Sequence, residues 1–225
     1  MLPLSDTRGT KRFAFITLLI IVINVIVFLF ELGAPDTEEF MLNWALVPAN
    51  VNFASVESLS RFITNQFLHA GFVHIISNMW FLWIFGDNVE EKFGSILFLL
   101  IYLLSGVIGG FSQYIFAPSS EIPMLGASGA VAGILGAYYV FFPHHRIRTL
   151  VPVFGFVRIV SIPASIMLVY WFLTQVFSGV GSIGYAAMGG VAWFAHVGGF
   201  VTGYVVAKIF DSVHIVEYIE DESLL

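Results

Sequence analysis

Residues 126–136 read GASGAVAGILG, a run of small side chains with one hydroxyl group, that of Ser128. The run opens an apolar segment that continues to Phe142 and stops at Pro143. Glycine and alanine recur at three- and four-residue spacing, so a helix over this segment has one nearly bare face. A second helix can approach that face closely, and Ser128 then lies in the seam. Such stripes are common where membrane helices touch, so packing alone is a sufficient explanation unless other residues add to it.

The composition indicates an integral membrane protein. Of 225 residues, 58% are hydrophobic and 11% are charged, whereas soluble domains carry about 25% charged residues. The formal net charge of −6 provides no basic surface for nucleic acid. The chain has no cysteine, which excludes disulfides, thiol catalysis and thiolate metal sites. Nothing in the sequence indicates a metal or an organic cofactor.

The apolar segments predict an all-α polytopic membrane protein, with six transmembrane helices in one compact bundle. A membrane-spanning helix requires about 20 residues. The expected spans are residues 13–30, 67–85, 95–116, 126–142, 159–177 and 191–210. Residues 1–12 are expected to form a cytoplasmic tail, residues 13–210 the membrane domain, and residues 211–225 an acidic cytoplasmic tail. Residues 31–65 mix acids with apolar side chains, which indicates a structured outer loop lying partly in the interface.

The connections carry their own expectations. The second span is expected to end at residues 86–88, before a polar link in which Glu90 caps or tethers helix ends. Residues 143–158 read as a basic loop, with His144 and His145 in solvent. The glycine-rich residues 179–190 form a candidate mobile cap.

Lysine and arginine predict the orientation, because they are enriched in cytoplasmic loops. Eight of the nine lie in the N-terminal tail, the second-to-third link, the fourth-to-fifth loop and the C-terminal end. Only Arg61 lies on the opposite side. We therefore expect both termini to be cytoplasmic and the 31–65 loop to face outward.

Polar side chains within membrane spans are costly and usually functional. The candidates are His74 and Asn78 in the second span, Ser128 in the fourth and His196 in the sixth. These three spans run in the same direction, and each residue lies near the start of its span. All four residues therefore fall at a similar depth toward the outer face.

The sixth span has a bare face of its own, suited to the one around Ser128. Pairing the two faces brings His196 to Ser128. The glycines expected to pack the helices around the site are Gly126, Gly129, Gly133, Gly199 and Gly203.

This set of residues suits nucleophilic catalysis. A serine hydroxyl becomes nucleophilic when a neighbouring base, such as the imidazole of His196, removes its proton. The tetrahedral oxyanion then needs hydrogen-bond donors, and the candidates are the His74 ring N–H, the Asn78 amide and the backbone N–H of Ser128. No acid is expected at this depth, so the residues permit a Ser–His dyad rather than a triad. Taken singly, an asparagine such as Asn78 more often makes an interhelical hydrogen bond, and a histidine such as His74 more often is the buried partner of a carbonyl.

The chain resembles the rhomboid intramembrane serine proteases of the minimal six-helix type, over roughly residues 61–205. The motifs that carry the resemblance are GASG at 126–129, AHVGG at 195–199 with Gly203, HIISNM at 74–79, FLHA at 67–70, and Gly86, Glu90 and Gly94 at four-residue spacing. The resemblance implies that Ser128 is the nucleophile and His196 the general base. It also implies that His74, Asn78 and the Ser128 N–H surround the oxyanion, and that the fifth span is a lateral gate.

Two positions depart from the family pattern. Rhomboids often have Trp-Arg in the first loop, where this chain has Ser60-Arg61. Some members place an aromatic residue four positions after the serine, against the imidazole, and this chain has Ala132 there. Another side chain, or none, must then orient His196. Trp171 in the fifth span is interpreted as a lipid-facing or packing residue.

The expected function is therefore cleavage of transmembrane segments near the outer face, through an acyl-enzyme. The expected partners are single-span or polytopic membrane-protein substrates and the lipid bilayer of a prokaryotic plasma (inner) membrane, with no nucleic acid; the sequence carries no signal for oligomeric state. A transporter would show broken helices in paired halves or intramembrane acids. The main alternative is a proteolytically inactive rhomboid-like protein that binds membrane clients, although such proteins typically lose the serine or histidine.

Overall fold

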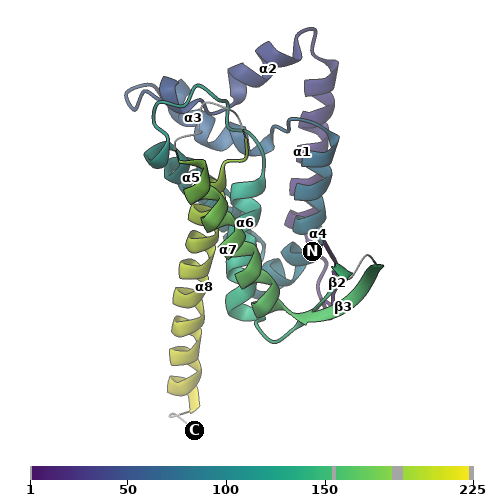
Figure 1. Cartoon of the computed structure of the whole chain (residues 1–225). Coiled ribbons are helices and arrows are strands. Elements are labelled where there is room, and N and C mark those ends of the chain that lie inside the picture. The colour runs from purple at the N-terminus through teal and green to yellow at the C-terminus, as the bar shows by residue number, and fades with distance from the viewer. Residues whose placement is uncertain (1, 154–155, 184–189, 223–225) are drawn as a thin grey trace.

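The computed structural model describes residues 2–153, 156–183 and 190–222, and it is a mostly helical bundle (Figure 1). The elements follow in the order β1 (Leu2–Asp6), α1 (Phe15–Gly33), α2 (Thr37–Trp44), η1 (Pro48–Asn50), α3 (Val56–Thr64), η2 (Asn65–Phe67), α4 (Phe72–Phe93), α5 (Ser95–Phe116), α6 (Ser128–Phe141), β2 (Arg146–Val153), β3 (Phe156–Pro163), α7 (Ala164–Ser182) and α8 (Trp193–Glu222). The predicted fold class, a polytopic helical membrane bundle, is confirmed.

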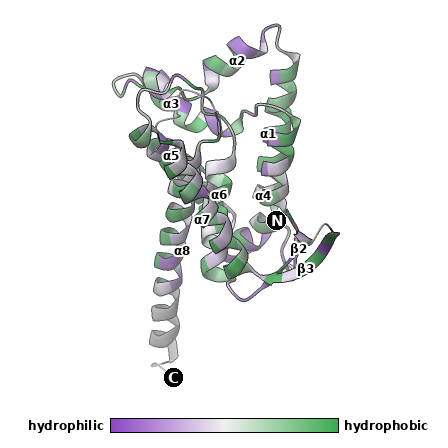
Figure 2. Cartoon of the chain, viewed as in Figure 1, coloured by the Kyte–Doolittle hydropathy of each residue, from purple (hydrophilic) through white to green (hydrophobic). Residues whose placement is uncertain are grey.

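Six apolar helices, α1 and α4 to α8, correspond to the six expected spans, and Figure 2 shows hydrophobic residues along most of their length. In the described part of the chain, α1, α5, α7 and α8 are each long and apolar enough to cross a membrane. A fifth span results if α4 is counted together with α3, from which it is bent by 81°. Helix α6 has 14 residues, which at 1.5 Å per residue is about 21 Å, less than the roughly 30 Å hydrocarbon core.

The short helix α6 is the centre of the bundle. Every residue from Gly129 to Tyr138 is buried, and α8 packs directly on its small-residue face. A Cβ atom at Gly199 would collide with the carbonyl of Gly129, and one at Gly203 with the carbonyl of Gly133. The backbones of α6 and α8 therefore touch, which fixes their relative position more tightly than large side chains could.

Helix α4 does not end at residues 86–88, as expected, but continues to Phe93. The continuation is stable because Glu90, 3% exposed, accepts hydrogen bonds from the backbone N–H groups of Ile16 at 3.0 Å and Thr17 at 2.7 Å. These amides belong to the first turn of α1, whose own N-cap provides no side-chain acceptor, so Glu90 is the cap that the sequence suggested. The turn to α5 follows at Gly94, whose φ of 79° favours glycine.

The expected basic loop at 143–158 is wrong, because these residues form most of a β-hairpin. Strands β2 and β3 pair antiparallel, with Ile147 opposite Ile162. The N-terminal segment adds β1 as a third strand, in the order β1-β2-β3. Helix α7 consequently begins at Ala164 rather than at residue 159. Alternating β-branched residues in an apolar run satisfied the span pattern equally well.

The remaining differences lie at helix ends. Helix α6 begins at Ser128, so Gly126 precedes it, and α7 extends to Ser182, so Gly179 and Gly181 are helical. Residues 184–189 of the expected cap lie outside the described part. Helix α8 continues through residues 211–222 of the expected tail. The loop over residues 31–65 contains α2, η1 and all of α3, so it is structured.

Candidate active site

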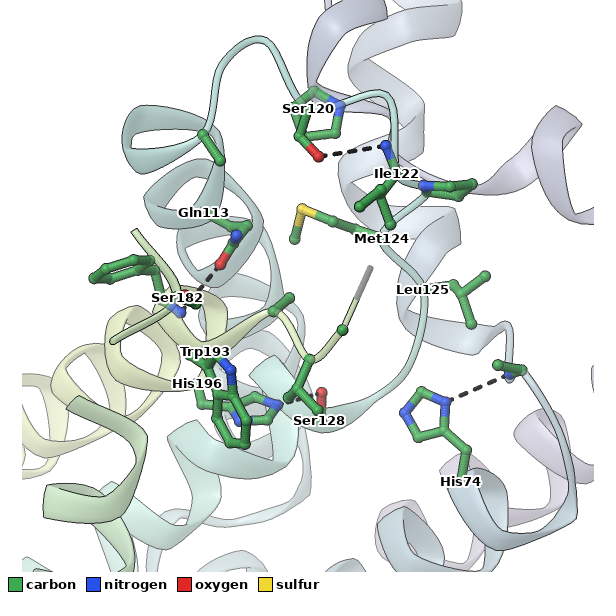
Figure 3. Close-up of a pocket in the computed structure, with 18 of the residues that line it drawn as sticks. His74, Gln113, Ser120, Ile122, Met124, Leu125, Ser128, Ser182, Trp193 and His196 are labelled. Atoms are coloured by element: carbon green, nitrogen blue, oxygen red, sulfur yellow. Dashed lines mark hydrogen bonds between the residues drawn. The ribbon is translucent and has the colours of Figure 1, made fainter. Parts of the chain in front are cut away.

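The first turns of helices α6 and α8 bring a serine and a histidine together. Ser128 is the first residue of α6, and His196 lies in the first turn of α8. The Ser128 Oγ and His196 Nε2 atoms are 2.8 Å apart, and Figure 3 shows both at the floor of a cavity. The contact depends on the close approach of α6 and α8 at their glycines, since the two residues are 68 positions apart in the sequence.

The other imidazole nitrogen contacts a residue that the sequence reasoning missed. The Nδ1 atom of His196 lies 2.8 Å from Oε1 of Gln175, on α7. The Nε2 atom of Gln175 donates to the carbonyl of Trp171 at 3.1 Å and to the hydroxyl of Thr174 at 3.0 Å. Because the amide nitrogen is committed to these acceptors, the amide oxygen faces His196. A carbonyl oxygen can only accept, so Nδ1 carries the proton and Nε2 presents its lone pair to Ser128.

Two indole rings enclose the imidazole. Trp171 stacks against His196 with ring centroids 6.0 Å apart and an interplanar angle of 30°. Trp193 meets it edge-on at 6.1 Å. Gln175 and Trp171 both belong to α7, so this helix supplies the orientation that Ala132 does not. Trp171 is a packing residue, as interpreted, but its partner is the histidine itself.

His74 and Asn78 line the same cavity from α4. Figure 3 shows His74 on the opposite side of Ser128 from His196. The Nδ1 atom of His74 accepts a hydrogen bond from the backbone of Ala70 at 3.4 Å, which leaves Nε2 as the protonated nitrogen facing the cavity. Asn78 is 7% exposed, and its amide nitrogen has no hydrogen-bond partner among the described residues.

Of the five glycines expected to pack the helices around the site, Gly126 packs against His74 of α4, whereas Gly129, Gly133, Gly199 and Gly203 lie in the seam between α6 and α8. A Cβ atom at Gly126 would lie 2.6 Å from the imidazole Nε2, and the φ of 123° also requires glycine. The backbone amide of Gly126 donates to Asn65 at 2.8 Å. The segment entering α6 is therefore held between η2 and α4, with the His74 nitrogen beside it.

The cavity has a volume of about 1020 Å³. Its described lining contains no Asp, Glu, Lys or Arg, and the two histidines are its only titratable side chains. Large apolar residues provide much of the wall: Phe72, Val73, Phe116, Met124 and Trp193. An uncharged cavity of this kind suits an apolar peptide segment better than a charged one.

Three polar residues in apolar helices were missing from the sequence-based candidates, although each was visible as a polar residue in an apolar segment. One is Gln175. Another is Gln113, whose Oε1 accepts from the Phe194 backbone at 3.1 Å and fixes the start of α8. The third is Glu31, because α1 extends to Gly33 and buries this acid; its carboxylate accepts from the His69 backbone at 3.2 Å and does not contact His196.

A family model described as "Rhomboid domain" matches residues 56–212. The chain belongs to the rhomboid family. It is 27% identical over 201 residues to Rhomboid protease GlpG of Photorhabdus laumondii, an alignment that covers 88% of this chain and 62% of that protein. It is 34% identical over 152 residues to RHOMBOID-like protein 6, mitochondrial, of Arabidopsis thaliana, covering 66% of this chain and 43% of that protein.

A shorter and more similar match, 44% identical over 77 residues, is to Rhomboid protease GluP of Bacillus subtilis and covers 34% of this chain and 15% of that protein. The chain thus spans less than two thirds of the length of each of these rhomboid relatives. They include bacterial and mitochondrial proteins, and some are named proteases whereas others are named only rhomboid-like.

Proposed function

We propose that this rhomboid is an intramembrane serine endopeptidase that cleaves transmembrane segments of membrane proteins. The observation that carries the proposal is the 2.8 Å contact between Ser128 Oγ and His196 Nε2. The Gln175 carbonyl on the far side of the ring, also at 2.8 Å, favours the tautomer that accepts a proton from serine. Family membership and the named protease relatives support the same activity.

In the proposed reaction, Ser128 Oγ attacks the scissile carbonyl carbon while His196 Nε2 takes the hydroxyl proton. The tetrahedral intermediate collapses when His196 returns that proton to the leaving amine, and an acyl-enzyme remains. Water then attacks the ester carbonyl while His196 takes its proton; the bond to Ser128 Oγ breaks, His196 returns the proton to that oxygen, and the carboxylate product leaves. The cavity beside the serine gives this water access.

Three groups are proposed to stabilise the oxyanion. They are the backbone N–H of Ser128, in the first turn of α6 where the helix dipole favours negative charge, the buried amide of Asn78, and the Nε2–H of His74. Removing one such donor typically costs about 100- to 1000-fold in turnover. The unpartnered Asn78 nitrogen fits this role, since an interhelical hydrogen bond would have given it an acceptor.

We infer that Gln175 is a positioning residue that holds His196 through its Nδ1–H. An amide carries no charge, so it orients the imidazole without the electrostatic support that an aspartate would give the protonated ring. Because Gln175 and Trp171 lie on α7, a substrate that enters beside α7 passes the helix that holds the base.

Both termini are placed on the cytoplasmic side in this proposal, from the distribution of lysine and arginine. Asp211 of α8 lies 3.9 Å from Lys92, close to the α4–α5 turn, so α8 runs toward the side where α1 begins. The start of α6 then faces outward, and cleavage takes place near the outer surface.

The test uses the purified protein and its Ser128→Ala variant in liposomes, with a panel of single-span substrates and mass spectrometry of the products. Cleavage at a defined peptide bond is expected for the parent protein, with a loss of at least roughly 1000-fold in the variant. Ser77→Ala is the matched control, because Ser77 lines the cavity but its hydroxyl donates to the His74 carbonyl. Unchanged cleavage by Ser128→Ala would refute the proposal. An absence of cleavage and of fluorophosphonate labelling in the parent protein would favour the inactive, client-binding alternative.

A further inference from the structure

The β2–β3 hairpin has an outer half whose side chains are exposed on both faces. In β3, Phe156 and Val157 are 71% and 69% exposed, and Ile159 and Val160 are 54% and 41% exposed. Successive residues of a strand point to opposite faces, so both faces carry uncovered apolar side chains. A strand adapted to water on one side alternates apolar with polar residues, and this strand does not.

The inner half of the hairpin is fixed to the bundle. Ile147 and Thr149 are fully buried, and the Thr149 hydroxyl contacts the Met167 sulfur of α7 at 3.7 Å. Strand β1 adds a third strand alongside β2, with Leu2 opposite Leu150. The direction in which the outer half projects is therefore set by the fold rather than by a flexible loop.

The hairpin and its flanks carry charge of one sign. Residues 143–163 contain three arginines and no acid. Arg146, Arg148 and Arg158 are all exposed, and in the strand register they alternate with apolar residues. Exposed guanidinium groups interleaved with apolar side chains are the combination that binds anionic lipid surfaces.

The hairpin also projects from the bundle at the level of helix ends. It connects the end of α6 to the start of α7, and Figure 1 shows it extending sideways from the bundle, at the side where the N-terminal segment begins. A sideways projection at the helix ends reaches past the bundle and over the surrounding bilayer.

We propose that the outer half of the β2–β3 hairpin, residues 150–152 and 156–160, is a lipid-binding element. It inserts at the boundary between headgroups and acyl chains, in the leaflet at the end where α1 begins, while Arg158 in this half and Arg146 and Arg148 in the adjoining inner half contact anionic phosphate groups. A protein strand added to the free edge of β3 would satisfy backbone groups but would leave both faces uncovered. Lipid covers both faces and neutralises the arginines, so it accounts for the apolar side chains and the charges together.

The experiment measures depth with nitroxide labels and does not depend on proteolysis. The chain has no cysteine, so Val157→Cys gives one labelled site in the full-length protein in nanodiscs. Gly9→Cys is the aqueous control, because it is exposed and an added Cβ meets no atom within 4 Å. Leu100→Cys on α5, 57% exposed, is the lipid control. Accessibility to oxygen and to a water-soluble nickel chelate is compared at the three sites.

In nanodiscs containing phosphatidylglycerol, Val157→Cys is expected to resemble Leu100→Cys, with high oxygen and low nickel accessibility. Replacing the three arginines with glutamine is expected to shift the label toward water. Each replacement is expected to lower the ratio of inserted to exposed hairpin about fivefold, from the attraction of one basic side chain to an anionic surface. In nanodiscs of pure phosphatidylcholine, the label on the Val157→Cys protein that keeps its three arginines is also expected to shift toward water.

Two results would overturn the proposal. If the Val157→Cys label is as accessible to nickel as the Gly9→Cys label in anionic nanodiscs, the hairpin lies in water. If it is inaccessible to both reagents, protein rather than lipid covers it, which points to a second copy of the chain. If the label stays inserted after all three arginines are replaced, the arginines are not needed for insertion, and the anionic-lipid part of the proposal is refuted.

Discussion

The two ends of helix α6 both carry buried polar networks, but the networks are built from different groups. At the start, Ser128 contacts His196, which contacts Gln175, and all three side chains can be neutral. Near the end, the Tyr138 hydroxyl donates to the Asp6 carboxylate at 2.9 Å, and Asn88 donates to the same oxygen at 2.6 Å. The start of α6 therefore has a network of neutral hydrogen-bonding groups beside a cavity. Near its end, the network includes a carboxylate from the N-terminal segment.

This difference indicates that the network at the start of α6 serves catalysis and the network near its end serves stability. A serine nucleophile requires a neutral base and room for substrate, and a fixed carboxylate beside the ring is not essential for either. The opposite end must join the N-terminal segment and α1 to α4, and Glu90 does so with four accepted hydrogen bonds. Substitutions at the first end should therefore affect catalysis, and those at the second should affect stability. Substitutions in the α6–α8 seam should affect both.

The largest effect is expected for Gly199→Ala, which should affect both the catalytic network at the start of α6 and the stabilising network near its end. The added Cβ collides with the Gly129 carbonyl, and relieving the collision requires α8 to move away from α6. We expect a loss of more than about 3 kcal/mol of stability together with loss of activity. Thermal unfolding in detergent measures the first. Gly181→Ala is the control, because a Cβ there meets no atom within 4 Å; equal effects of the two substitutions would contradict the close-approach explanation.

Glu90→Gln should reduce stability and leave the chemistry intact. The substitution places an amide nitrogen against amide and hydroxyl donors, so buried donors lose their acceptor. The expected loss is about 2–3 kcal/mol, with an unchanged cleavage rate per folded molecule. Glu91→Gln is the matched control: its salt bridge with Arg8, 2.8 Å long, involves side chains 13% and 27% exposed, and its loss should cost about 1 kcal/mol or less. A specific activity that falls in parallel with stability in Glu90→Gln would connect the two ends of α6.

Gln175→Leu should instead reduce catalysis and leave stability nearly unchanged. Removing the Nδ1 acceptor frees the imidazole to change tautomer, and we expect a roughly 10- to 100-fold fall in kcat with little change in KM, which corresponds to about 1.4–2.7 kcal/mol in the barrier. The ¹⁵N NMR signals of His196 should report the Nδ1–H tautomer in the parent protein and a mixture in the variant. Gln113→Leu, at a glutamine that lines the cavity and contacts the Phe194 backbone instead of His196, should leave that tautomer unchanged. A retained tautomer in Gln175→Leu would show that Trp171 stacking alone orients the ring.

The smallest effect is expected for Asp6→Asn, and it is a dependence on pH. Burial raises the pKa of Asp6 above its ordinary value, against the lowering effect of hydrogen bonds from Tyr138 and Asn88. The folded protein therefore binds this proton more tightly than the unfolded chain, so stability increases as pH falls through the folded-state pKa and levels off below about 3.9. Asp6→Asn removes this component. The Tm difference between parent and variant should grow in favour of the parent on acidification; a difference independent of pH would contradict the assignment.

Much of the fold followed from local chemistry. Long apolar runs in the sequence place the helices in a membrane, and α5 has the same bounds in sequence and structure, residues 95–116, because Gly94 and the loop over residues 117–125 interrupt the run on both sides. The hairpin did not follow, because the valine- and isoleucine-rich residues after Arg158 also fit an apolar span. The third strand, β1, could not be predicted from local pattern either, because its partner β2 is more than 140 residues away.

The site divides in the same way. The sequence predicts that Ser128, His196, His74 and Asn78 are polar residues at one depth of a membrane domain, because a bilayer leaves few polar positions unexplained. Only the folded structure shows that Ser128 contacts His196, that Gln175 and Trp171 contact the imidazole, and that Gly126 packs beside His74. Direct contact requires particular distances and helix rotations, and these are set by the packing of α6, α7 and α8 together. No single segment contains that information.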